Sequence, residues 1–303
     1  MLKLNNGYFY LFLTVFFFST YEVVGRTLTN LVNPYQLNFV RFFIGGLILL
    51  PIALKNIKSK NIRMTWQDFL LLVLIGLTNV VFSMSFLQLG INMTSASLSA
   101  VIFSSNPLFV MIVASFVLGE KLNSTKIYGL ILGIIGLVIV FYKQLNVGGN
   151  HLVGIILLVL SSITYGIYTV IGKKFTVKYD SVVMNSFSFI IGSLMLLPIL
   201  LYNKYPVFNL PAKAIPQMLY LTVFVTGIAY YTYFLGLSSV NTGVGSMVFF
   251  AKPVLASIIA SIFLSEKITI QLVIGTIVIL IGIFIVQKDN IAIFSRKNAD
   301  EET

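Results

Sequence analysis

The sequence predicts an all-α integral membrane protein with ten transmembrane helices, arranged as two inverted five-helix repeats with both termini in the cytoplasm. Three observations lead to this prediction. A long stretch of sequence occurs twice, the composition is too apolar for a soluble domain, and Lys and Arg are unevenly distributed among the loops. The duplication indicates two repeats, the composition indicates that the protein lies in a membrane, and the basic residues indicate which side of the membrane each loop faces.

Residues 89–140 are repeated without a gap at 235–286. The matched pairs include Gly90 and Gly236, Pro107 and Pro253, and Glu120 and Glu266. The chain before each copy repeats as well, since the stretch 21–26 corresponds to 168–173. We therefore expect a first five-helix repeat over 1–143, a second over 148–288, and a polar cytoplasmic tail over 289–303.

The composition excludes a soluble core. Hydrophobic residues make up 58% of the chain and charged residues 10%, against roughly 45–50% and 25% in soluble domains. Ten segments approach the roughly 20 apolar residues that a membrane-spanning helix requires. They are 7–25, 35–54, 68–89, 95–118, 126–142, 152–172, 182–202, 215–236, 243–264 and 270–287. Five spans per repeat is an odd number, so the second repeat must enter the membrane in the opposite orientation.

The basic residues give the orientation. With the N-terminus in the cytoplasm, most Lys and Arg lie in cytoplasmic loops or the tail, and few lie on the outer side. This is the bias expected of a membrane protein. The formal charge of +11 does not indicate nucleic-acid binding, because the basic residues sit between apolar runs. With no cysteine, a disulfide scaffold, a thiolate metal site and a thiol nucleophile are all excluded.

Several short motifs accompany the repeat. They are TyrGluValValGlyArg at 21–26, ArgPhePhe at 41–43, Asn106-Pro107 and Lys252-Pro253 in mid-helix, and GlyGluLys at 119–121 with SerGluLys at 265–267. Together they resemble the EamA-type permeases of the drug/metabolite transporter superfamily. The resemblance implies ten helices, a central cavity between the repeats, and transport of small solutes, mostly outward, by alternating access. Phe18 and Tyr165 stand where this family usually has Trp.

Three charged residues lie within the predicted spans: Glu22, Arg41 and Lys252. Each is costly in the bilayer unless it is paired or hydrated. Glu22 and Arg41 have similar predicted depth on consecutive helices. They are therefore either a structural ion pair or functional groups. The functional alternatives are an outer gate and a proton-linked carboxylate at Glu22. Arg26 is an alternative partner for Glu22.

Lys252 is predicted to lie near the membrane midplane, directly before Pro253, and its repeat mate is Asn106, directly before Pro107. Each proline removes a backbone donor and kinks its helix. Kinks at corresponding positions of inverted repeats indicate a binding site, although prolines also kink helices that bind nothing. A midplane ammonium requires a cavity, a carboxylate or a bound anion, and no acidic residue lies at the middle of any predicted span. We therefore expect Lys252 to lack an acidic partner and to bind an anionic substrate group. The alternatives are a neutral lysine or a contact with a backbone carbonyl freed by a kink.

Further polar and aromatic residues at similar depth are candidates for the same pocket, although each is individually more typical of helix–helix hydrogen bonding. These are Asn38, Asn79, Ser83, Tyr165, Tyr168, Asn185, Tyr230 and Tyr231. Glycines at 129, 133, 136, 275 and 282 permit close helix contact, either within one chain or in a homodimer. The sequence contains no metal-ligand spacing, phosphate loop or nucleophile elbow.

The sequence therefore indicates a secondary transporter in the cell membrane rather than an enzyme, with no prosthetic cofactor and no metal. Its expected substrate is a small polar metabolite such as an amino acid or organic acid, exported around a midplane site with protons as a possible coupling ion. The alternatives are a pore or channel, a transporter of phosphorylated or drug-like solutes, and an enzyme acting on a membrane lipid.

Overall fold

The computed structural model describes residues 2–117, 124–142, 150–239, 248–282 and 284–285. The described residues form helices and short connections, with no strand among them. The predicted tail, the loop 143–149 and the Gly119-Glu120-Lys121 motif lie outside them. The all-α prediction is therefore confirmed for the part of the chain that the structure covers.

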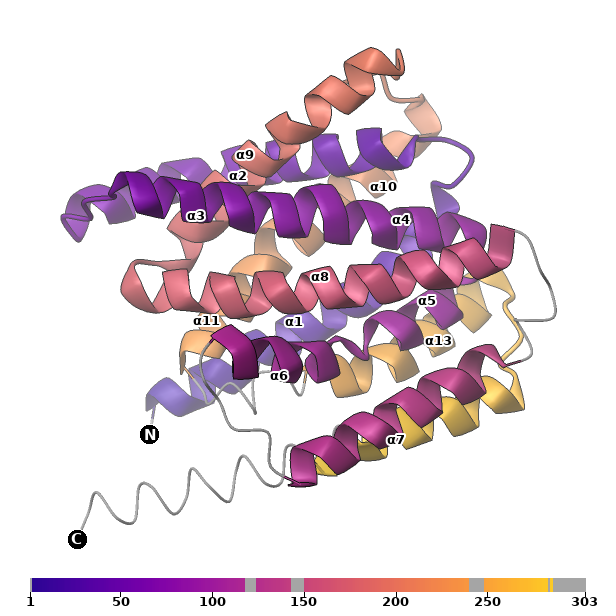
Figure 1. Ribbon diagram of the computed structural model, residues 1–303. Helices are drawn as coiled ribbons and strands as arrows, with labels where there is room; N and C mark the ends of the chain where they lie inside the picture. The colour runs from indigo at the N-terminus through magenta and orange to yellow at the C-terminus, as the bar shows by residue number, and fades with distance from the viewer. Residues whose placement is uncertain (1, 118–123, 143–149, 240–247, 283, 286–303) are drawn as a thin grey trace, which may run out of the picture.

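The first repeat consists of long apolar helices joined by short turns (Figure 1). Its elements are α1 (Leu2–Thr27), α2 (Pro34–Ser59), α3 (Trp66–Gly76), η1 (Leu77–Ser83), α4 (Met84–Met93), α5 (Ala96–Phe103), α6 (Asn106–Val117) and α7 (Ser124–Phe141). The elements α3, η1 and α4 form one continuous span, and α5 and α6 form the next.

The second repeat is built in the same way. Its elements are α8 (Asn150–Lys178), α9 (Ser181–Tyr202), η3 (Ala212–Ala214), α10 (Ile215–Tyr220), η4 (Leu221–Ala229), α11 (Tyr230–Ser239) and α13 (Val248–Leu264), followed by an apolar helix at Ile270–Gly282. Here η3, α10, η4 and α11 make a single span.

Six of the described helices are long and apolar enough to cross a membrane. They are Pro34–Ser59, Trp66–Met93, Ala96–Val117, His151–Thr176, Ser181–Tyr202 and Ala212–Gly236. The helix α1 and three shorter apolar helices, Ile127–Val140, Lys252–Leu264 and Ile270–Gly282, occupy the remaining predicted spans. The membrane-spanning all-α architecture is thus observed, whereas the count of ten and the side of the termini stay predictions.

Polar residues in the connections between the apolar segments cap the N-termini of α2 and α3. The side chain of Asn33 accepts a hydrogen bond from the Tyr35 N–H at the start of α2. Pro34 has no N–H, so it leaves no unpaired donor in the first turn of this helix. Thr65 and Asp68 form a capping box at the start of α3. Asp68 thus lies in the first turn of α3, where a negative charge is favoured.

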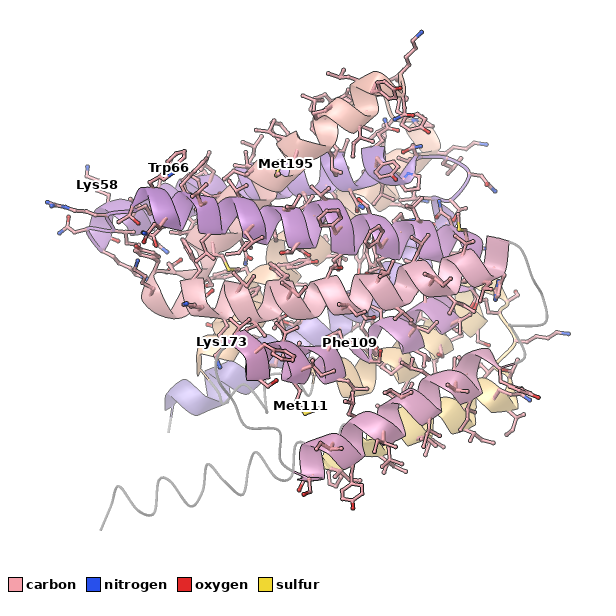
Figure 2. All side chains as sticks on the ribbon, viewed as in Figure 1. Lys58, Trp66, Phe109, Met111, Lys173 and Met195 are labelled. Carbon is pink, nitrogen blue, oxygen red and sulfur yellow. The ribbon has the colours of Figure 1, made fainter. Side chains whose placement is uncertain are left out.

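Two ion pairs join helix ends on one side of the molecule: the end of α2 to the start of α9, and the start of α3 to the end of α8. Lys60 donates to Asp180 at 2.5 Å, and Lys178 donates to Asp68 at 2.8 Å. Partial burial disfavours the charged form of Asp180, but hydrogen bonds from Lys60, the Val182 N–H and Asn56 outweigh it. They hold the pKa of that carboxyl below its ordinary value. Lys58, Trp66 and Lys173 lie at this same end of the bundle (Figure 2).

Corresponding helices of the two repeats pack against each other. The helix α2 lies along α9, and α7 lies along Ile270–Gly282 at one edge of the molecule (Figure 1). A Cβ added at Gly136 would approach the Gly275 carbonyl to 2.8 Å, and one at Gly282 would approach the Gly129 carbonyl to 2.6 Å. These glycines therefore serve packing within the chain, which was one of the two expected roles.

Both repeats contain a π-helical segment in the third helix: η1 in the first and η4 in the second. The two segments overlap in the duplicated sequence, since residues 77–83 correspond to 223–229 at the offset of 146 that relates Gly90 to Gly236. A π-helical turn is less regular than an α-helix and often occurs at functional sites. These segments were not predicted from the sequence.

Candidate functional site

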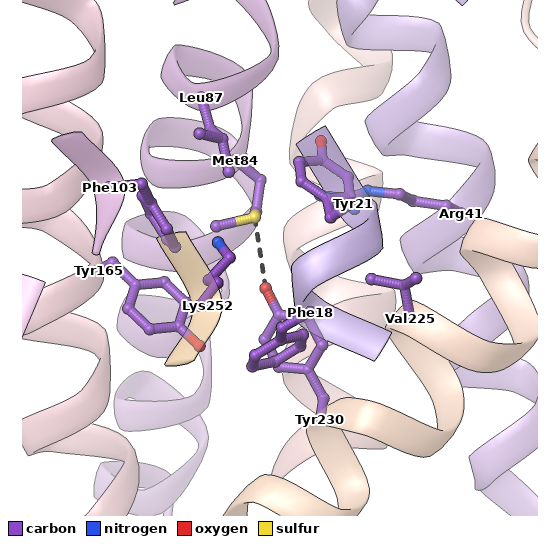
Figure 3. Close-up of a pocket in the computed structure, with 10 residues that line it drawn as sticks. All are labelled: Phe18, Tyr21, Arg41, Met84, Leu87, Phe103, Tyr165, Val225, Tyr230 and Lys252. Atoms are coloured by element: carbon purple, nitrogen blue, oxygen red, sulfur yellow. Dashed lines mark hydrogen bonds between the residues drawn. The ribbon is translucent and has the colours of Figure 1, made fainter. Parts of the chain in front are cut away.

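A buried pocket lies where helices of both repeats meet (Figure 3). Its cavity volume is about 20 Å³. Ten residues line it: Phe18, Tyr21, Arg41, Met84, Leu87, Phe103, Tyr165, Val225, Tyr230 and Lys252. They come from α1, α2, α4, α5, α8, η4, α11 and α13, so the pocket exists only when the two repeats pack together.

Lys252 on α13 donates a hydrogen bond to Oε1 of Glu22 on α1 at 2.5 Å. Both side chains are almost inaccessible, with 2% exposure for Lys252 and none for Glu22. The Lys252 ammonium also lies 4.4 Å from the centre of the Phe103 ring, a distance at which the ring attracts a cation. The second Glu22 oxygen, Oε2, is buried and has no hydrogen-bond partner.

Arg41 on α2 enters the pocket from another direction (Figure 3). Its guanidinium carbon lies 4.4 Å from the ring centres of both Tyr21 and Phe42. Its Nε donates to Oδ1 of Asn38 at 3.0 Å. One terminal nitrogen of Arg41 is buried without a hydrogen-bond partner. The side chain is thus held by stacking and by an amide rather than by a carboxylate.

The ion pairing differs from the expected one. Glu22 was expected to pair with Arg41 or Arg26, but its carboxylate binds Lys252 instead. Arg26 donates to the backbone carbonyls of Ile91 and Asn92. Lys252 was expected to lack an acidic partner, and this was wrong because α1 packs directly on α13. The sequence indicates the depth of a residue along its helix, but it does not indicate which distant helices are neighbours.

The two prolines act differently in the two repeats. The span containing Pro107 breaks at Ser104 and Ser105, between α5 and α6, so the predicted kink is present there. The amide of Asn106 donates to the Phe103 carbonyl at 2.9 Å, the acceptor that Pro107 leaves without an N–H. In contrast, Pro253 lies inside the continuous helix α13.

Four of the predicted site residues line the pocket: Arg41, Tyr165, Tyr230 and Lys252. The Tyr230 hydroxyl contacts the Met84 sulfur at 3.3 Å (Figure 3). Tyr165 packs edge-on against Phe103, with ring centres 5.0 Å apart. Tyr231, although adjacent to Tyr230, is only half-buried and does not line the pocket.

The other predicted residues form a buried polar layer around the pocket. Asn38 donates to Ser85 at 3.4 Å, and Ser83 donates to the Ser161 carbonyl at 3.0 Å. Asn185 accepts from the Tyr168 hydroxyl at 3.4 Å and donates to the Tyr230 carbonyl at 3.2 Å. Asn79 is fully buried in η1. With the exception of Asn79, these side chains therefore connect neighbouring helices or helical turns.

Four residues that line the pocket were not among the predicted site residues: Tyr21, Met84, Leu87 and Val225. Tyr21 is the repeat mate of Tyr168, so the duplication itself contained a signal for it. The apolar residues carry no such signal, because Met, Leu and Val are common throughout the spans.

Glu266, which follows α13, joins the two repeats at one end of the molecule. Its carboxylate accepts hydrogen bonds from the N–H groups of Ala96 and Ser97 at 2.7 and 2.9 Å, and from the Ser97 hydroxyl at 2.7 Å. These groups form the first turn of α5, where a negative charge is favoured. The repeat mate, Glu120, lies outside the described residues.

The sequence matches the EamA-like transporter family over residues 5–142 and again over 152–287. The chain belongs to this family. It is a multi-pass transporter of the cell membrane, and its EamA repeats agree with the drug/metabolite transporter superfamily that the motifs resemble.

Named relatives support the same assignment. An uncharacterized transporter of Clostridium kluyveri is 35% identical over 95% of this chain and 94% of its own length. An uncharacterized transporter of Bacillus subtilis, YoaV, is 27% identical over 88% of this chain and 90% of its own. A WAT1-related chloroplastic protein of Arabidopsis thaliana is 27% identical over 89% of this chain and 67% of its own.

A solved crystal structure has the same fold. It superposes with a TM-score of 0.69 at 17% identity and covers 93% of this chain and 96% of its own. At this level of identity the likeness concerns the fold alone.

Proposed function

We propose that this EamA-family protein is a secondary transporter that exports a small polar metabolite, such as an amino acid or organic acid, by alternating access around the pocket at Lys252. The buried charged groups in this pocket, enclosed by helices of both repeats, are the observation that carries the proposal. Charges deep in a membrane protein are costly and mark substrate or ion paths. Outward transport is the direction that the resemblance to EamA permeases implies.

The pocket is almost closed in this structure. Its cavity volume of about 20 Å³ is about enough for one water molecule, so a solute can enter only after the helices around it move apart. Aromatic and aliphatic side chains form most of its wall, and charged or hydroxyl groups occupy a few positions. Such a wall suits a solute with a short apolar body and one or two polar groups.

The contact made by Glu266 supplies a reversible closure on the outer side of the membrane in the proposed orientation. It joins α5 of the first repeat to the end of α13 in the second. The two repeats must separate at this point for the pocket to open outward. Alternating access requires such a contact that forms in one state and breaks in the other.

Transport by this protein is tested by counterflow in proteoliposomes. Vesicles preloaded with a mixture of unlabelled amino acids and small organic acids should accumulate a labelled member of the mixture transiently and saturably. Empty vesicles carrying the same protein should not. Discrete conductance steps in a planar bilayer, without counterflow, would instead identify a channel.

The topology is tested with single cysteines, which the natural chain lacks. We expect an impermeant thiol reagent applied to intact cells to label Asn209→Cys but not Ser59→Cys, which lies beside Lys60. Both side chains are exposed in the structure, so a difference in labelling reports the side of the membrane. Equal labelling would contradict the ten-span arrangement.

Glu266→Gln should favour opening on the outer side, because a neutral amide binds the first turn of α5 less strongly than a carboxylate. A loss of about 1 kcal/mol would change the ratio of open to closed protein roughly fivefold. The measurement is the rate at which an external thiol reagent modifies Leu87→Cys in the pocket. Lys267→Gln is the control, since it leaves the carboxylate in place. An unchanged rate in Glu266→Gln would exclude this closure.

A further inference from the structure

We propose that Arg41, rather than Lys252, binds the negatively charged group of the substrate, and that this group is a carboxylate. The inference deepens the proposed transport function and rests on it. It follows from the balance of charges in the pocket, from one unsatisfied donor, and from the way the guanidinium is held.

The charges in the pocket do not cancel. Glu22 and Lys252 form an ion pair at 2.5 Å and together contribute no net charge. Arg41 belongs to none of the ion pairs among the described residues. Its side chain is nevertheless 1% exposed and lines the pocket. Among the described residues, Glu22, Arg41 and Lys252 together therefore carry one surplus positive charge, which a bound monoanion would neutralise.

The hydrogen bonding of Arg41 also leaves room for a ligand. Its Nε is engaged by Asn38 at 3.0 Å, whereas one terminal nitrogen is buried without a partner. A buried donor without an acceptor is unfavourable, so an arriving oxygen would relieve this cost. Lys252 already donates to Glu22.

The guanidinium is oriented before any ligand arrives. Tyr21 and Phe42 each place a ring centre 4.4 Å from its central carbon, and Asn38 holds Nε. A fixed planar fork matches the two oxygens of a carboxylate better than a flexible ammonium does. The three charged positions are also where the repeats differ, because Ser188, Thr169 and Asn106 correspond to Arg41, Glu22 and Lys252.

The neighbouring wall is apolar, which suits the hydrocarbon body of a small carboxylic acid. Phe18, Met84, Leu87 and Val225 contribute apolar surface to the pocket. Oε2 of Glu22 is buried without a hydrogen-bond partner, so an α-ammonium group has an available acceptor. A plain organic acid and an amino acid thus share the carboxylate contact and differ at the second group.

The test measures stabilisation of the purified protein by matched pairs of solutes in a thermal unfolding assay in detergent. The probes are lactate and lactamide, which differ only at the carboxyl group, with leucine as the ammonium-bearing carboxylate and phosphoserine as the phosphate. A ligand that binds the folded state raises the unfolding temperature. We expect lactate, leucine or both to stabilise the protein and lactamide to have no effect.

Arg41→Gln should weaken carboxylate binding at least tenfold. Arg41→Lys should keep the preference for the acid over the amide at reduced affinity. It also serves as the second variant if Arg41→Gln does not fold. The double change Glu22→Gln with Lys252→Met should still prefer the carboxylate, because the surplus charge on Arg41 remains.

Three results would overturn the inference. The first is undiminished carboxylate binding in Arg41→Gln, and the second is loss of the carboxylate preference only in the double variant. The third is stabilisation by phosphoserine or by lactamide when neither lactate nor leucine stabilises the protein. Failure of both carboxylates to stabilise the natural protein would also reject the substrate class. In each case, counterflow of another solute would leave the transporter proposal intact, so the two failures are distinguishable.

Discussion

Glu22→Gln alone, or Lys252→Met alone, should lower the free energy of unfolding by about 3–5 kcal/mol, because either change leaves an unpaired charge in the protein interior. The two side chains are 0% and 2% exposed and 2.5 Å apart, so solvent cannot replace the lost partner. The double change removes both charges and should cost far less than the two single changes together. Replacing a buried ion pair by neutral groups is often close to neutral in stability.

This expectation is measured by unfolding the purified variants in mixed micelles with increasing denaturing detergent. Lys60→Met is the matched control, since it breaks an ion pair of the same length in which the lysine side chain is 52% exposed. An exposed pair contributes about 0–1 kcal/mol, so the control should unfold close to the natural protein. Additive losses in the double variant would contradict a direct interaction between Glu22 and Lys252.

The buried charged residues could be found from the sequence, but the pairing of Glu22 with Lys252 could not. Glu22, Arg41 and Lys252 stand out because each interrupts an apolar run. Their partners depend on which helices are neighbours, and α1 and α13 are separated by most of the chain. Helices consecutive in sequence were expected to supply the partners. The packing of α1 against α13 across the two repeats overrides that expectation.

The helical architecture was more predictable, because duplication and hydrophobic periodicity are properties of the chain itself. The break near Pro107 follows from the missing N–H of proline. The segments η1 and η4 follow from no comparable rule. Their residues are ordinary for membrane helices, and the extra backbone residue in a π-helical turn leaves no local pattern. Only their recurrence at matching positions in both repeats distinguishes them from a local irregularity.

The crossing of α3 and α9 should be the least tolerant contact in the fold. A Cβ added at Gly76 would lie 2.5 Å from the Ser188 carbonyl oxygen and 2.9 Å from the Gly192 nitrogen. A Cβ at Gly192 would lie 2.7 Å from the Gly76 carbonyl. These neighbours are backbone atoms, so no side chain can rotate away. The two helices would have to separate.

Gly76→Ala should therefore reduce stability by about 1–3 kcal/mol, the usual cost of overpacking, and Gly76→Leu should prevent the protein from folding. The matched control is Gly227→Ala in η4, where the added Cβ would meet only the Thr222 carbonyl at 3.5 Å, an ordinary contact. Because alanine is favoured over glycine within helices by about 0.5–1 kcal/mol, this control should unfold at or above the temperature of the natural protein. Equal unfolding temperatures for Gly76→Ala and Gly227→Ala would show that α3 and α9 cross less closely than the structure places them.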